Sequence, residues 1–306
     1  MHLPIETGQI AEKPSMESIQ AERPEADSPS VADDLPVTVI EPRPGWRIID
    51  FRELWRFREL LYYLTWRDIK VRYKQTALGI VWALLQPLAA MLVFALFLGK
   101  LGGVGANVEN YSLFVFAGIL PWTFFANAIT NAGNSVVANE KLVTKIYFPR
   151  LLAPISSVAG AIFDFVIALG LLGVLMACYG LVPSWRILLA PLIFGILVLA
   201  ALGVGSLLAA LIVAQRDFRY ILAFGVQLWM FATPAIYLPP ETFGEAAQTW
   251  LPFNPAYGLI LNFRLATLGG SLDWYALGVS SAMAILLVFV GAGYFRRVEK
   301  SFADII

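Results

Sequence analysis

The chain has 306 residues, of which 58% are hydrophobic and only 14% are charged, whereas a soluble domain carries about 25% charged residues. Most of the chain therefore does not face water. Its single cysteine, Cys178, and single histidine, His2, argue against a disulfide framework, a metal site and a Ser-His-Asp or Cys-His catalytic group.

Residues 1–45 are acidic, although the formal net charge of the whole chain is zero. They hold nine acidic and three basic residues, together with seven prolines and no aromatic residue. Such a segment cannot bury enough apolar surface to offset the entropy lost on ordering. We therefore predict a disordered acidic cytoplasmic tail, which also lacks the apolar run of a secretory signal.

Residues 46–74 are basic and show helical periodicity. Apolar residues recur at the spacing of one helix face, and they are Phe51, Leu54, Phe57, Leu61 and Leu64. The segment ends with the basic residues Arg67, Lys70, Arg72 and Lys74. A basic amphipathic helix with tryptophans suits the cytoplasmic surface of a bilayer. We therefore predict an interface helix, with a simple topology anchor as the alternative.

Six uncharged runs follow, each long enough for a membrane core that needs about 20 apolar residues. They are residues 75–99, 110–139, 165–185, 187–215, 220–240 and 274–295. The third begins earlier, near Leu151, with only Asp164 interrupting it. We predict an all-α polytopic membrane protein with six transmembrane helices in residues 75–306. Segments on the side of the two termini carry seventeen Lys and Arg residues against three on the opposite side, which places both termini in the cytoplasm.

The second run carries polar and aromatic side chains. Asn127, Asn131 and Asn134 lie four and three residues apart and therefore share one helix face. Because buried amides are costly unless paired or hydrated, this strip either lines a hydrophilic path for a glycan or bonds to neighbouring helices. The aromatic residues near the outer end are Trp122, Phe124 and Phe125. Their rings could stack on sugars, although an interfacial aromatic belt is the commoner arrangement.

The loop at residues 139–150 reads NEKLVTKIYFPR and mixes charged with apolar side chains. An ordinary positive-inside loop explains the basic residues but not the apolar ones. A short rigid helix with exposed apolar side chains can instead transmit a rigid-body push from a partner. The candidate contact residues are Glu140, Lys141, Leu142, Lys145, Ile146, Tyr147 and Arg150.

Asp164 is the only acidic residue inside a predicted span. An acid at membrane depth is a functional candidate by default. No basic residue lies within any other predicted span, so we expect Asp164 to be protonated or hydrogen-bonded by amides. Proton coupling is the less favoured alternative.

Residues 237–273, before the last span, are too apolar for a solvated loop. The prolines that break every helical run there are Pro239, Pro240, Pro252 and Pro255. Broken backbone at membrane depth must be shielded by protein or line a cavity. We therefore predict short re-entrant helices in the outer leaflet.

Three stretches carry a family resemblance: LTWRDIKVRYKQTALGIVWALLQPL, NEKLVTKIYFPRLLAPISS and LPFNPAYGLILNFR. They are similar to signatures of the membrane subunit of type-2 ABC exporters for cell-surface polysaccharides such as O-antigen, capsule and teichoic acid. The resemblance covers residues 50–300 and leaves out the tail. It implies a homodimer in the bacterial inner membrane, paired with two copies of a separate ATP-binding subunit, that moves an undecaprenyl-diphosphate-linked glycan. It also implies that loop 139–150 is the coupling helix that contacts the ATPase.

The sequence has no G-x-x-x-x-G-K-[ST] phosphate loop. ATP and Mg²⁺ would therefore bind the partner, and we expect no cofactor, no nucleic-acid partner and no catalytic residue in this chain. A type-2 permease for drugs or simple lipids is the alternative within the transporter class. A glycan-modifying membrane enzyme, such as a glycosyltransferase, is the alternative from another class, but the sequence lacks the clustered acids that such chemistry calls for.

Overall fold

The computed structural model describes residues 51–74, 79, 81–108, 110–242, 244–299 and 302. The predicted tail, residues 1–45, and residues 46–50 of the predicted interface helix lie outside the described residues. The described part consists of helices and the loops that join them, without a strand. It confirms the predicted all-α class of polytopic membrane protein.

Five helical segments in the described part are long and apolar enough to cross a membrane. They are Val81–Leu101 (α3, Val81–Phe94, continued by the π-helix η3), Tyr111–Ala138 (α4), Leu152–Cys178 (α6), Trp185–Ala214 (η5, then α7 from Ala190) and Trp274–Val298 (α11). The fifth predicted span is shorter than its uncharged run, because α8 covers only Phe218–Phe231. The helix ends just before Thr233, where the following Pro234 disfavours helical backbone.

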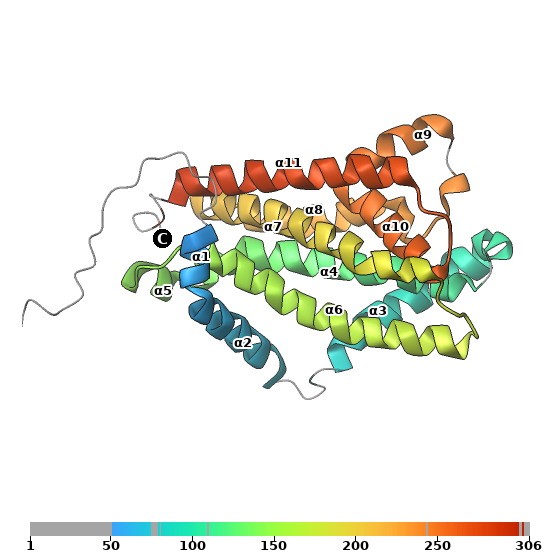
Figure 1. Cartoon of the computed structure of the whole chain (residues 1–306), viewed down its shortest axis with the longest axis horizontal. Coiled ribbons are helices and arrows are strands. Elements are labelled where there is room, and N and C mark those ends of the chain that lie inside the picture. Colours follow the sequence, from blue (N-terminus) through green and yellow to red (C-terminus); the bar gives the residue numbers. More distant parts are fainter. Residues whose placement is uncertain are drawn as a thin grey trace, which may run out of the picture. The chain divides into compact units, whose positions relative to one another are not determined.

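α4 is the central helix of the bundle. It packs against α3, α6, α7, α8 and α10 (Pro255–Leu268), and Figure 1 shows α6 on one side of it and α7 on the other. The most apolar stretch of α4 is 78% buried inside the subunit, against at most 39% for the other four spans. This position allows a membrane-spanning helix to carry asparagines, because they face protein or a cavity rather than lipid.

α7 and α11 approach each other backbone to backbone. A Cβ atom added to Gly291 would lie 2.0 Å from the carbonyl oxygen of Gly203. A Cβ atom added to Gly203 would lie 2.6 Å from the backbone of Leu287. Small residues permit such close contact between membrane helices, so Gly203 and Gly291 pack within the subunit.

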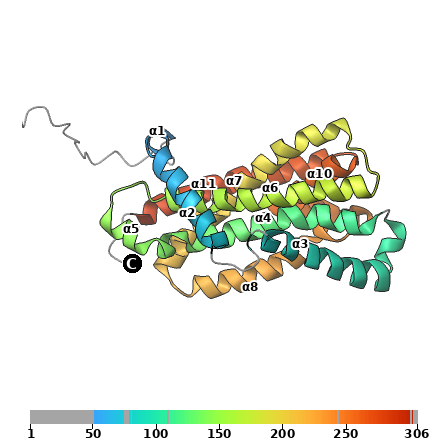
Figure 2. The same cartoon turned by 90° about the horizontal axis from the view of Figure 1, so that it is seen from below.

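The predicted interface helix is divided into α1 (Phe51–Arg56) and α2 (Arg58–Lys74). α2 packs against α6, and Figure 2 shows it crossing the bundle near α5 (Glu140–Lys145). The apolar residues of this segment that pack in or against a cluster containing Val136 and Phe148 are Leu54, Phe57, Leu60, Leu61 and Leu64. Trp55 and Trp66 are exposed. The apolar stripe therefore attaches the helix to the bundle, while the tryptophans remain available to the membrane surface.

The segment at residues 237–273 forms short helical pieces, as predicted from its prolines. They are η7 (Pro240–Thr242), α9 (Glu245–Trp250), η8 (Leu251–Phe253) and α10. α10 is enclosed by α4, α7 and α11 and is buried along most of its length. The Asn254 side chain caps it by accepting a hydrogen bond from the Ala256 amide (3.1 Å). The placement of this segment in the outer leaflet stays a prediction.

Candidate functional site: a polar cavity beside the interface helix

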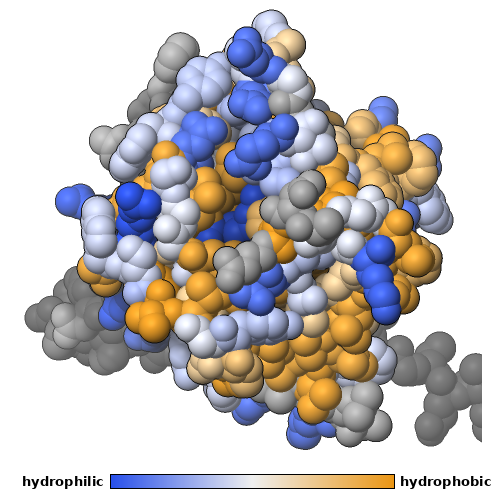
Figure 3. All heavy atoms as spheres, turned by 90° about the vertical axis from the view of Figure 1, so that its right-hand side faces the viewer, coloured by the Kyte–Doolittle hydropathy of each residue, from blue (hydrophilic) through white to orange (hydrophobic). Residues whose placement is uncertain are grey.

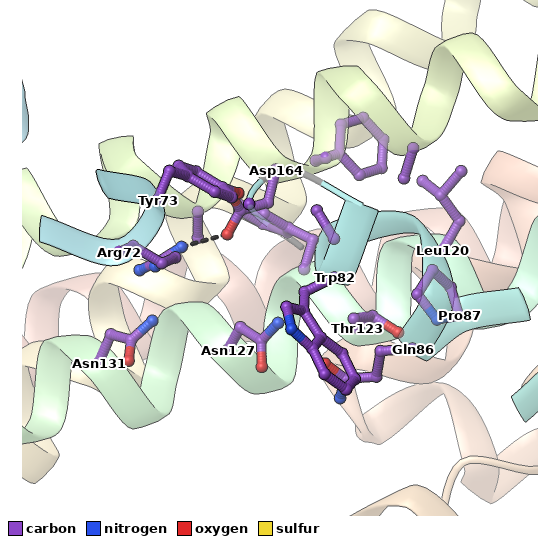
Figure 4. Close-up of a pocket in the computed structure, with 16 residues that line it drawn as sticks. Arg72, Tyr73, Trp82, Gln86, Pro87, Leu120, Thr123, Asn127, Asn131 and Asp164 are labelled. Atoms are coloured by element: carbon purple, nitrogen blue, oxygen red, sulfur yellow. Dashed lines mark hydrogen bonds and ion pairs between the residues drawn. The ribbon is translucent and has the colours of Figure 1, made fainter. Parts of the chain in front are cut away.

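A cavity of about 340 Å³ lies between α2, α3, α4 and α6. Figure 4 shows a charged group at one end, amides along α4, and apolar side chains at the other end. The polar lining residues are Arg72, Tyr73, Gln86, Thr123, Asn127, Asn131 and Asp164. The remaining lining includes Trp82, Pro87, Leu120, Phe124, Phe165 and Ala168.

An ion pair lies at the end of the cavity that α2 forms. Arg72 donates a hydrogen bond to the Asp164 carboxylate, and the Tyr73 hydroxyl donates another to the same carboxylate. The side chains of Arg72 and Asp164 are 33% and 17% exposed. Burial and the neighbouring Asp164 raise the pKa of Tyr73, so its hydroxyl remains a hydrogen-bond donor at neutral pH. The Arg72–Asp164 pair leaves this cavity without net charge.

The ion pair corrects the expectation for Asp164. The sequence predicts a protonated or amide-bonded acid, because no other predicted span holds a basic residue. The structure supplies a cation from α2, whose last turn lies against α6. Arg72 was not considered as a partner of Asp164, because it precedes the first predicted span and only residues within the spans were considered. Asp164 therefore serves as an ion-pair partner, and the proposal of proton coupling loses its basis.

The asparagine strip of α4 has two environments. Asn127 and Asn131 line the cavity, and neither amide forms a hydrogen bond within the described part of the chain. Asn134 lies beyond the cavity, where its amide donates to the Thr130 carbonyl (2.8 Å) and its side-chain carbonyl accepts from Arg219 (3.1 Å). The two interpretations of the strip therefore apply to different residues. Asn127 and Asn131 are placed for contact with a ligand, which stays a prediction, and Asn134 joins α4 to α8.

The predicted aromatic residues also have different environments. All three rings are buried in the same hydrophobic core, with 5% of Trp122, 3% of Phe124 and 0% of Phe125 exposed. Of the three, only Phe124 also lines the cavity. Trp82 of α3 lines the cavity and is 52% exposed. Sequence reasoning missed Trp82. The available signal was a tryptophan one helical turn from Gln86 in an otherwise apolar run.

The loop predicted to contact an ATPase exposes only part of its candidate set. The exposed residues, here called the α5 surface, are Glu140, Lys141, Lys145, Ile146 and Tyr147. Leu142 packs against the cluster that contains Val136 and Phe148. The Arg150 amide donates to the Glu299 carboxylate (3.1 Å), and its guanidinium donates to the Glu299 carbonyl. Leu142 and Arg150 therefore hold the loop against the bundle.

The basic residues at the end of α2 have distinct positions. Arg67 donates a hydrogen bond to the Asn139 side chain (2.6 Å), where α4 meets α5. Lys70 and Lys74 are exposed. α2 is thus attached at two points, through Arg67 to the α4–α5 junction and through Arg72 to α6.

Removing the ion pair is expected to weaken the attachment of α2 to α6. In Arg72→Gln and Asp164→Asn variants, the free energy of unfolding should fall by about 1.5–3 kcal/mol, which is typical for a hydrogen bond to a charged group. The double variant should lose less than the sum of the single variants, because the second change removes a group that is already unpaired. Unfolding of the detergent-solubilised protein measures these losses, with Lys74→Gln as an exposed control. Additive losses would show that the pair does not attach α2.

The sequence profile of the family described as "ABC-2 type transporter" matches residues 59–268, a range that contains α5 and every residue of the cavity. The chain is 31% identical to the O-antigen export system permease protein RfbA of Myxococcus xanthus, over 83% of this chain and 98% of that protein. It is 30% identical to RfbA of Klebsiella pneumoniae, over 81% and 95%. It is 21% identical to the polysialic acid transport protein KpsM of Escherichia coli, over 77% and 92%.

Proposed function

Because the chain belongs to the ABC-2 type transporter family, we propose that it is the permease subunit of an ATP-driven exporter for a lipid-linked cell-surface polysaccharide. The substrate is an O-antigen or a similar glycan on undecaprenyl diphosphate, taken from the cytoplasmic leaflet. Relatives that are about 30% identical are named for O-antigen export.

The chemistry of the cavity is the observation that carries the glycan assignment. The groups that remain for a ligand are amides, a threonine hydroxyl and an indole, because Arg72 and Asp164 neutralise each other. Amides and hydroxyls exchange hydrogen bonds with sugar hydroxyls, and the exposed Trp82 offers a flat face to sugar C–H groups. The apolar end suits the lipid of the same substrate.

The exporter would contain two copies of this subunit and two copies of an ATP-binding subunit. ABC-2 permeases pair with ATP-binding subunits, and the α5 surface is the part of this chain that we assign to that contact. ATP and Mg²⁺ would be held by the partner. Both termini and α5 would lie in the cytoplasm, in agreement with the distribution of Lys and Arg over the loops.

Deletion of the gene tests the proposed function. We expect loss of the surface polysaccharide, with accumulation of lipid-linked glycan that is inaccessible to a periplasmic ligase or an external lectin. The wild-type gene should restore the polysaccharide, whereas the gene with Asn127 and Asn131 both replaced by leucine should restore it far more slowly. A normal glycan surface in the deletion strain would instead favour a permease for drugs or simple lipids.

A further inference from the structure

Arg264 of α10 is a buried cation that does not line the cavity described above. Its side chain is only 2% exposed, and its guanidinium carbon lies 3.7 Å from the centroid of the Phe114 ring. Nη1 donates to the Ala235 carbonyl (2.5 Å), whereas the buried Nη2 has no hydrogen-bond partner within the described part of the chain.

Arg264 also lacks a close counter-ion. Among the residues that the structure describes, no carboxylate forms an ion pair with it, and the acid that acts on it from a distance, Glu241, is exposed. A buried charge is unfavourable when neither a counter-ion nor a complete set of hydrogen bonds compensates its lost hydration. The surroundings of Arg264 can therefore accept an anion.

A second cavity, of about 260 Å³, adjoins this arginine. Arg264 and Asn110 form its polar wall, and the other wall residues are mainly leucines and Phe114. Asn110 precedes α4, Leu181 follows α6 and Gly270 follows α10, so the cavity lies at the end of the bundle opposite α5. Figure 3 views that end and shows a hollow with hydrophilic atoms at its floor and apolar atoms around it.

We propose that this second cavity binds the phosphate of an anionic lipid in the outer leaflet of the membrane. The guanidinium group presents several N–H donors that match phosphate oxygens. A second cation, Arg186, donates a hydrogen bond to the carbonyl of Gly270 (2.7 Å), a residue that lines the cavity.

The walls favour a lipid over free phosphate. Leucine side chains such as Leu181 and Leu268 suit the glycerol and acyl part of a lipid, and the ends of membrane spans lie at the depth of the headgroups. Two arginines repel the ammonium group of a zwitterionic headgroup, so phosphatidylglycerol fits better than phosphatidylethanolamine. The site would hold this lipid whatever substrate the permease moves.

Lipid titration of the full-length purified protein tests the site. Phosphatidylglycerol, phosphatidylcholine and inorganic phosphate are added separately in detergent at constant ionic strength. Native mass spectrometry follows bound lipid, and thermal unfolding follows all three ligands. We expect saturable binding of phosphatidylglycerol and a rise in the unfolding temperature, with little effect of the other two. Equal stabilisation by inorganic phosphate would overturn the assignment to a lipid.

Two variants separate the cavity from general lipid binding. Arg264→Gln removes the cation. Leu181→Trp keeps the cation and fills the cavity, so it still tests lipid binding if Arg264→Gln does not fold. Each should weaken phosphatidylglycerol binding by about tenfold or more. The first variant loses a charge-assisted contact, and the second fills the space that the lipid would occupy. Lys100→Gln removes an exposed cation elsewhere on the outer side and should bind as the wild type does. Wild-type affinity in Leu181→Trp would refute the proposal.

Discussion

Replacement of Ile146 and Tyr147 by aspartate is expected to abolish polysaccharide export. These side chains are 55% and 72% exposed on the α5 surface, although both are apolar over most of their area. Truncation of a hot-spot side chain at the centre of an interface costs about 2 kcal/mol or more, and we expect Ile146 and Tyr147 to be such side chains. Loss of two such contacts should weaken binding of the ATP-binding subunit on the order of a thousandfold. Co-purification of the two subunits and the amount of surface polysaccharide measure the effect.

The position of Leu142 decides which residues belong in that variant. Leu142 packs inside the subunit, so an aspartate there would disrupt the fold and could not report on docking. Tyr62→Asp with Tyr63→Asp is a suitable control, because these α2 residues are 67% and 75% exposed. The control should keep the ATP-binding subunit bound. Normal co-purification of the Ile146/Tyr147 variant would assign the coupling contact to another surface.

The α-helical class and most spans could be predicted from the sequence, because uncharged runs of membrane length are a local property. The apolar stripe of α2 was also visible, since Leu54, Phe57, Leu61 and Leu64 repeat at helical spacing. Periodicity gives the face of a helix but not what covers that face. It therefore could not show that the stripe packs against Val136, near the end of α4, and against Phe148, in the loop after α5.

The candidate site was less predictable because it depends on contacts between distant segments. Asp164 and Arg72 are 92 residues apart in the chain, and nothing local to either indicates the other. Trp122 and Phe125 resemble surface aromatics in the sequence, yet α4 is central and both rings are buried. Trp82 could not be identified as a cavity residue, because the sequence of an apolar run does not distinguish exposed from buried tryptophans.

The division of the asparagine strip allows a test with an internal control. Asn127 and Asn131 line the cavity, whereas Asn134 lies on the same helix and bonds to Arg219. Replacement of Asn127 and Asn131 by leucine removes two hydrogen-bonding groups from the proposed glycan path and leaves the bond of Asn134 to Arg219 of α8 intact. If each group contributes about 1 kcal/mol in the transporting state, export should slow by about thirtyfold. Insertion and unfolding temperature should change little, because leucine suits a membrane helix.

Asn134→Leu should show the opposite pattern. It removes a bond between helices, which is worth about 0.6 kcal/mol in membrane proteins, so the unfolding temperature should fall slightly while export continues. Export is measured as the rate at which labelled glycan reaches the cell surface, normalised to the amount of permease in the membrane. Equal export defects in both variants would indicate that the strip acts through packing alone.

Cysteine labelling distinguishes a hydrated path from a sealed one. Single cysteines at positions 127, 131 and 134 are introduced after the exposed Cys178 is replaced by alanine. During turnover, a membrane-impermeant thiol reagent should modify positions 127 and 131, because Asn127 and Asn131 face the cavity. Ala128 and Ile129 are fully buried on the other side of α4 and provide the background. Protection of positions 127 and 131 equal to that background, together with normal export by the leucine variant, would exclude this cavity from the path of the glycan.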